Sequence, residues 1–218
     1  MMKPLNKAVG AQKALTEVHG DRQDYRPLAD GVTLDQLVRF MNVRVELQPM
    51  CASMMEAGDK FRQMDELEQD GEEPSRGELF RAMGDVMGAA MGFAGNIGRF
   101  TQVRNEALLA EGMGLGEYIW IYTLVYNSWL GYPPGQDFDD EQGGAYSAKD
   151  QEIIRRLMRN HADVLAEAGR LAEAETWRSE ADHLERREGS GVPWVDHDMP
   201  MALTSTFELY RSDLADLH

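Results

Sequence analysis

The chain has 218 residues, a formal net charge of −16 at pH 7 and an apolar content of 43%. This apolar content is ordinary for a globular protein and excludes wholesale disorder. The negative charge argues against nucleic-acid binding and against a polybasic membrane anchor, because both need concentrated Lys and Arg.

The sequence gives only a default expectation for the compartment. Cys51 is the single cysteine, so no intramolecular disulfide can form. No apolar segment of the kind found in signal peptides is visible at the start, which favours the cytoplasm. A periplasmic or secreted protein whose leader had been removed would look the same. The apolar stretches 86–95 and 118–130 are too short for a membrane span.

Residues 1–30 lack sustained periodicity and predict a loosely ordered N-terminal arm, with at most a short helix near 8–18. A single helical domain is expected over 31–218. Its first helix begins at the capping box Thr33-Leu-Asp-Gln36, in which the two side chains satisfy free amides. Apolar residues at three- and four-residue spacing then predict a long helix, kinked by Pro49.

The next predicted helix carries a stripe of glycines and should end near residue 110. Gly84, Gly88 and Gly92 are spaced four apart. Glycine costs about 1 kcal/mol relative to alanine inside a helix, so this stripe indicates that another backbone comes very close. We expect a central helix that packs on two sides. A close homodimer through the same glycines is the alternative.

The most aromatic part of the chain follows, at 118–129. A strand is compatible with its composition, but no second strand-like segment exists to pair with it, which favours a helix. One face then carries four aromatic side chains, Tyr118, Tyr122, Tyr126 and Trp129. They form either plain core, which is the simpler interpretation, or the wall of a ligand pocket.

Residues 148–187 predict two helices joined near Gly169, or one continuous helix. Gly169, Leu171, Ala174 and Ala181 give this segment a pattern that resembles the second half of a tetratricopeptide repeat. No second copy occurs at the repeat period, so the resemblance implies a helical hairpin and no solenoid.

The last predicted helix starts at the capping box Ser205-Thr-Phe-Glu208. Its apolar residues are Phe207, Tyr210, Leu214 and Leu217. This helix is expected either to pack against the bundle and complete its core or to provide a surface that binds a partner.

Chemical motifs are scarce. Glu180 and His183 share a helix face, and a hairpin at Gly169 would bring His161 opposite them, which would allow a mononuclear metal site. Exposed charge is the simpler account of these residues. No nucleophile elbow, phosphate loop or dinucleotide motif is present, and nothing predicts a cofactor.

The sequence therefore predicts an all-α protein, an irregular bundle of roughly five or six helices. The expected function is non-catalytic binding or scaffolding through protein–protein contacts, with a protein partner and, as an option, a homodimer. The alternative is a small-ligand-binding protein or enzyme with a pocket beside 118–130.

Overall fold

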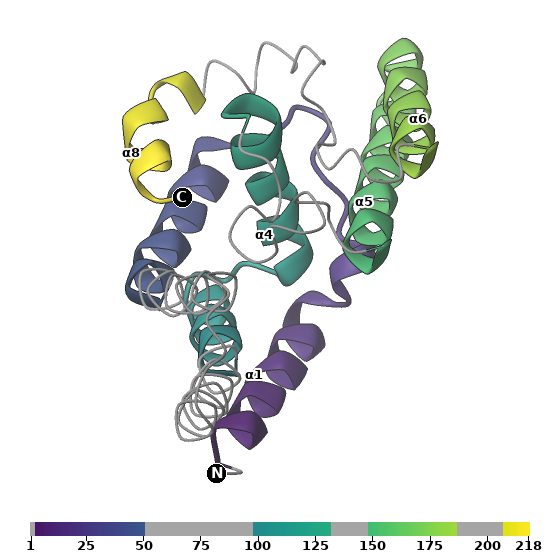
Figure 1. Ribbon diagram of the computed structural model, residues 1–218. Helices are drawn as coiled ribbons and strands as arrows, with labels where there is room; N and C mark the ends of the chain where they lie inside the picture. Colours follow the sequence, from purple (N-terminus) through teal and green to yellow (C-terminus); the bar gives the residue numbers. More distant parts are fainter. Residues whose placement is uncertain (1–2, 51–97, 132–147, 187–206) are drawn as a thin grey trace, which may run out of the picture.

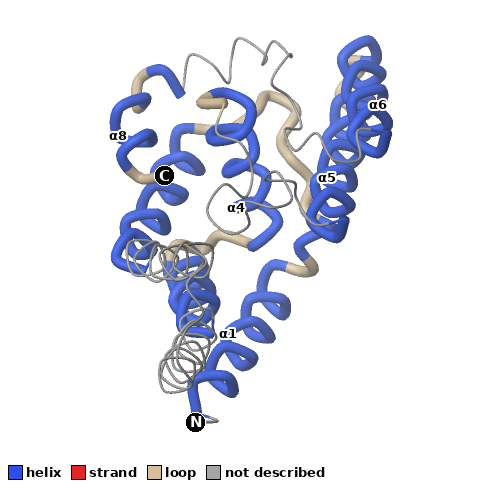
Figure 2. Tube along the Cα trace, viewed as in Figure 1, coloured by secondary structure: helices blue, strands red, loops and turns tan. Residues whose placement is uncertain are grey.

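The computed structural model describes residues 3–50, 98–131, 148–186 and 207–218. Within these ranges all regular elements are helical and no strand is present, which confirms the all-α class (Figure 2). The elements are α1 (Lys3–His19), η1 (Arg22–Asp24), a helix over 34–50, a helix over 98–110, α4 (Leu115–Tyr122), η2 (Thr123–Trp129), α5 (Ala148–Glu167), α6 (Leu171–Arg186) and α8 (Arg211–Asp216).

Two features predicted from the sequence fall at or beyond the edge of this description. Gly84, Gly88 and Gly92 lie outside the described residues, and the close packing expected of them stays a prediction. Of the long first helix the structure describes residues 34–50, which are helical throughout. The kink at Pro49 likewise stays a prediction.

The middle of the fold is occupied by α4 and η2. Helix 34–50 and α8 lie on one side of them, and the hairpin of α5 and α6 lies on the other (Figure 1). One main core joins these elements. Its fully buried members include Leu37, Phe40, Ile121, Leu124, Leu157, Phe207 and Leu214.

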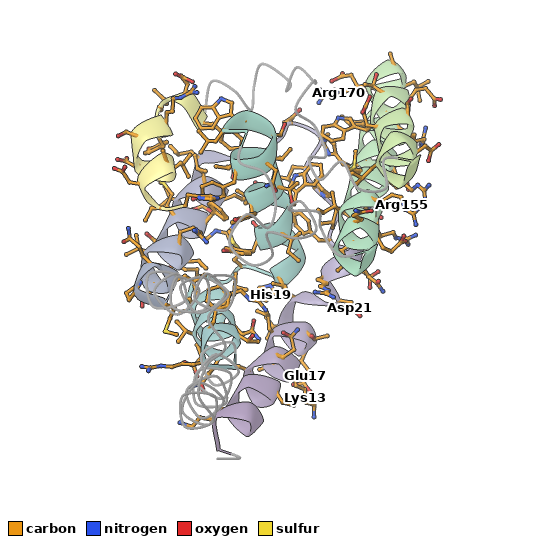
Figure 3. The ribbon with its side chains drawn as sticks, in the orientation of Figure 1. Lys13, Glu17, His19, Asp21, Arg155 and Arg170 are labelled. Carbon is orange, nitrogen blue, oxygen red and sulfur yellow. The ribbon has the colours of Figure 1, made fainter. Side chains whose placement is uncertain are left out.

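Residues 1–30 contain α1 and η1 where the sequence showed no periodicity. Leu15 of α1 is buried in the main core, and the Gln12 side chain accepts a hydrogen bond of 2.9 Å from Asn105. Lys13 and Glu17 of α1 are exposed and form an ion pair at the surface (Figure 3). Among the described side chains of α1, Leu15 is the fully buried apolar one. A helix with so few buried apolar positions produces a weak periodic pattern, which explains why the sequence did not reveal its full length.

Two of the predicted signals at helix ends correspond to hydrogen bonds, whereas the capping box at Ser205 begins outside the described residues and stays a prediction. The Thr33 amide donates to Gln36 Oε1 at 3.0 Å and the Gln36 amide donates to Thr33 Oγ1 at 3.2 Å, which confirms this capping box. Gly169 has a φ of 80° between α5 and α6. The Arg170 amide donates to the Leu165 carbonyl there, closing a Schellman turn that reverses the chain.

Gly116 allows α4 to pack closely against the segment that follows α1. A Cβ atom at Gly116 would lie 2.2 Å from the Arg22 carbonyl oxygen and 2.6 Å from the Tyr25 Cβ. A buried polar network secures the same junction, since the Gln36 amide group donates to Tyr25 Oη and to Glu117 Oε1. These contacts hold α4 at a defined position between its neighbours.

The hairpin is attached to the same segment by polar contacts. Asn160 on α5 donates to the carbonyls of Gln23 and Tyr25, at 2.9 Å and 2.8 Å. Arg170, at the turn of the hairpin, donates to the Ala29 carbonyl (Figure 3). The connection between α1 and helix 34–50 therefore holds the hairpin against α4.

Candidate binding site around Arg44

The aromatic face predicted from the sequence surrounds a buried arginine. Arg44 lies on the core side of helix 34–50, and its guanidinium carbon is 5.5 Å from the ring centre of Tyr122 and 5.2 Å from that of Tyr126. Tyr118 and Phe40 stack beside it, with ring centres 5.3 Å apart. We call this set, Phe40, Arg44, Tyr118, Tyr122 and Tyr126, the Arg44 site.

The guanidinium of Arg44 binds the main chain of the last helical segment. Its Nε donates to the Leu217 carbonyl oxygen at 2.8 Å, and Nη2 donates to the same oxygen. Its Nη1 donates to Tyr118 Oη at 3.4 Å. The ring of His218 lies 4.9 Å from the ring of Tyr126. Residues near 217 therefore cover the site.

The electrostatics of the site favour a permanent positive charge. Burial by itself lowers the pKa of Arg44, because it removes water from the cation. The phenol groups of Tyr118, Tyr126 and Tyr122 outweigh this effect and raise the pKa above its ordinary value. Ring faces attract the cation directly. The Arg44 site is a charged centre inside an aromatic enclosure.

The aromatic segment is helical, as predicted, but it is not an α-helix throughout. From Thr123 to Trp129 it is a π-helix, and the Leu130 amide donates to the Val125 carbonyl, five residues back. Residues four apart drift by about 40° around an α-helix, so a plain α-helix would carry Tyr126 away from Tyr118. The wider π turn reverses this drift, which allows the three tyrosines to meet one guanidinium.

Trp129, the fourth aromatic residue predicted for this face, takes part in a different contact. Its ring is 5.6 Å from the ring of Phe207, and the guanidinium carbon of Arg211 lies 4.8 Å from its centre. Phe207 and Leu214 are completely buried. Segment 207–218 therefore closes the described core, and Trp129 helps to hold it there.

The structure also places the residues of the predicted metal site. His161 on α5 is buried between Trp120 and Trp177, whose ring centres are 5.3 Å and 5.0 Å from its own. Among the described side chains no group of three or more His, Cys, Asp or Glu is arranged to hold a metal ion. The side chain of His183 lies outside the described part, so the set His161, Glu180 and His183 stays a prediction.

Burial changes the chemistry of His161. Removal from water lowers its pKa to about 4, although the Pro27 carbonyl accepts a hydrogen bond from the ring and opposes the change. His161 is therefore neutral at pH 7. Its aromatic neighbours give it the surroundings of a core residue.

Sequence reasoning missed Arg44, and one signal could have found it. Leu37, Phe40 and Leu47 are spaced as one buried face of a helix, and Arg44 occupies the remaining position of that face. A charge at a core position requires a compensating environment. The sequence alone does not indicate that tyrosines some 70 residues away supply it, as the separation of 74 positions between Arg44 and Tyr118 shows.

The same helix, 34–50, also carries exposed apolar side chains. Leu34, Val38 and Val45 are exposed, and Met41 between them is partly buried. Their spacing of four, three and four residues places them on one face, opposite the core. We call these four residues the 34–45 face.

The comparisons with known proteins add no functional information. No protein-family model matches the chain, and neither a curated protein nor a solved structure does. Within the described ranges, no helix has both the length and the apolar character that crossing a membrane requires.

Proposed function

We propose that this protein is a non-catalytic binding or scaffolding protein that holds another protein through the 34–45 face. The observation that carries the proposal is that helix 34–50 is apolar on two opposite sides. A helix at the surface of a globular protein normally presents polar side chains to water. An exposed apolar patch on a folded protein is a common mark of an interaction site, so this second apolar face has the character of a surface with a partner.

The edges of the 34–45 face support this proposal. Arg39 donates to the Gly112 carbonyl at 2.9 Å, and Asn42 donates to Glu111 at 3.1 Å. These bonds tie helix 34–50 to the end of helix 98–110. The helix is therefore held rigidly while its apolar face stays exposed, which lowers the entropic cost of binding. A helix of a partner protein, packed lengthwise, suits a face of this shape.

A matched pair of variants tests the proposal. Val45 in the 34–45 face is 52% exposed, and Val18 on α1 is 67% exposed. We expect Val45→Asp to abolish association with a partner, because a charge on the face must lose its water on binding. Val18→Asp should leave association unchanged. Affinity purification from the native source measures capture of the partner, and sedimentation velocity measures self-association.

Both variants should retain the thermal midpoint of the wild type, because both side chains face solvent. Capture of the same proteins by all three forms, together with identical sedimentation, would show that the 34–45 face binds nothing. Loss of self-association in Val45→Asp alone would identify a second copy of the chain as the partner.

A small-ligand function is the second candidate, and the π-helix η2 favours it. π-helical turns are frequent at functional sites. Of the three tyrosines in the Arg44 site, Tyr118 and Tyr126 are buried and Tyr122 is partly exposed. We propose for this case that a ligand contacts the phenol of Tyr122. Replacing Tyr122 by Phe should then weaken ligand binding while stability stays within about 1 kcal/mol of the wild type.

A further inference from the structure

Segment 207–218 contacts the rest of the protein in the way that a docked helical peptide contacts a receptor. Two apolar side chains seven residues apart, Phe207 and Leu214, are completely buried. The main chain that follows them is captured by side chains of helix 34–50. Arg44 donates to the Leu217 carbonyl, and Gln48 donates to the Asp216 carbonyl at 3.2 Å. Leu214 lies on α8 and Phe207 on the turn before it. Spaced apolar anchors together with captured main chain resemble the way a helical peptide is recognised.

The contact between Arg44 and Leu217 leaves the guanidinium without a full counter-charge. Nε and Nη2 both donate to one uncharged peptide oxygen. This edge of a guanidinium fits the two oxygens of a carboxylate through parallel hydrogen bonds. Within the described part of the chain, the groups that raise the pKa of Arg44 are phenols, and no Asp or Glu forms an ion pair with it. Buried charges are normally paired with an opposite charge.

We propose that the Arg44 site is a receptor for the C-terminal carboxylate of a helical segment of another protein, and that segment 207–218 occupies the site in its absence. The partner helix carries apolar residues at the positions equivalent to Phe207 and Leu214, ten and three residues before its last one. Its terminal carboxylate takes the place of the Leu217 carbonyl between Nε and Nη2 of Arg44. Segment 207–218 is then an internal competitor, kept at high local concentration by its own chain.

This inference concerns the core side of helix 34–50, whereas the proposed function concerns its exposed 34–45 face. The two surfaces can be tested separately. Val45→Asp should not change binding at the Arg44 site, and substitution of Arg44 should not change capture by the 34–45 face in a folded protein.

The experiment uses two fluorescein-labelled peptides with the sequence of residues 204–217. One ends in a free carboxylate at Leu217, and the other ends in an amide that keeps the carbonyl oxygen without the charge. The receptor is the full chain carrying Leu214→Ala, which weakens the internal competitor while leaving it attached. Fluorescence anisotropy should show the acid peptide binding about tenfold more tightly, the effect of one charge-assisted hydrogen bond.

Three further measurements make the result specific. The protein carries a net charge of −16, so non-specific electrostatics would favour the amide peptide and cannot produce the expected preference. Adding Arg44→Lys keeps the positive charge but removes the pair of parallel N–H donors. It should reduce the preference for the acid peptide over the amide peptide to about twofold. In the wild-type chain, the acid peptide should accelerate amide hydrogen exchange within residues 207–218, and the amide peptide should not.

Equal affinity of the two peptides for the Leu214→Ala chain would overturn the proposal. It would also be overturned if neither peptide bound and exchange within residues 207–218 stayed unchanged in the wild type. The wild-type exchange measurement decides the matter if Leu214→Ala proves too unstable to study.

Discussion

On each side of the central helices α4 and η2, one basic side chain is buried among aromatic rings. The pKa of one is raised and the pKa of the other is lowered. On one side Arg44 is buried against Tyr122 and Tyr126, and its pKa is raised. On the other side His161 is buried between Trp120 and Trp177, and its pKa falls to about 4. Both side chains are buried, so burial alone does not determine the direction in which the pKa of a base moves.

The difference lies in what the surrounding groups offer to a cation. Arg44 meets ring faces, a phenol oxygen and the Leu217 carbonyl. The Trp177 ring stands almost perpendicular to the His161 ring, at 86°, and Nδ1 of His161 is buried without a hydrogen-bond partner among the described groups. An imidazolium has two N–H donors to satisfy, and the described residues offer no second acceptor. The comparison teaches that the acceptors and ring faces next to a buried base decide in which direction its pKa moves from the ordinary value.

The largest expected effect comes from a substitution that disturbs both sides together. Gly116→Ala places a Cβ atom 2.2 Å from the Arg22 carbonyl oxygen, so α4 must move relative to both clusters. We expect a loss of about 3 kcal/mol or more in the free energy of unfolding, measured by urea denaturation. Gly98→Ala is the matched control. A Cβ there meets nothing within 4 Å, and the change should stabilise its helix by up to about 1 kcal/mol.

A substitution at His161 changes only the neutral side. The folded pKa of about 4 is below the ordinary value of 6.5, so between these pH values the unfolded chain binds a proton that the folded chain does not. The stability that results is complete above pH 6.5 and is lost as the pH falls to about 4. His161→Phe should remove about 2–3 kcal/mol of this pH dependence, measured as the wild-type-minus-variant difference between pH 7 and pH 4.5. Identical pH profiles would mean that folding does not shift the pKa of His161.

Arg44→Met tests the charged side. It leaves the Leu217 carbonyl without its donor and removes the cation from the ring faces. We expect a loss of about 2 kcal/mol in the free energy of unfolding. Arg44→Lys keeps the charge and should lose about half as much. A more stable Arg44→Met protein would indicate that the cost of burying the guanidinium exceeds its interactions, as occurs for some buried ion pairs.

The smallest effect is expected from Tyr118→Phe. The Arg44–Tyr118 hydrogen bond is long, at 3.4 Å, so its loss should cost about 0.5 kcal/mol. The Tyr118 ring should continue to pack against Phe40, and the thermal midpoint would fall by only a few degrees. A loss larger than that of Arg44→Met would show that the hydroxyl, and not the main-chain contact at Leu217, is the principal acceptor of the site.

Local signals in the sequence predicted the local parts of this fold. The Thr33–Gln36 capping box depends on residues three apart, and the turn at Gly169 depends on one residue that adopts positive φ at little cost. The Arg44 site depends instead on residues from three separate parts of the chain. A position such as Leu217 contributes only a peptide carbonyl, which every residue possesses. No sequence pattern can mark such a contact.

The π-helix shows the same limit in another way. Hydrogen bonding over five residues occurs where Tyr122 and Tyr126 pack against Arg44, whereas the composition of 123–129 equally suits an α-helix. The sequence therefore predicted the right class of element and a nearly correct aromatic face. No local signal within 123–129 indicates the π-helical register of its second half.

A π-helical turn is equivalent to an α-helix with one residue too many. Deleting a residue from η2, such as Asn127, would let the backbone return to α-helical hydrogen bonding over four residues. The amide groups of this segment would then form hydrogen bonds of better geometry. Everything beyond the deletion would turn by about 100° relative to α4, because that is the contribution of one residue to a helix. Trp129 would then no longer face Phe207. In residues 123–129, therefore, a one-residue deletion would improve the hydrogen bonding of the helix and would disrupt its contacts with the rest of the protein.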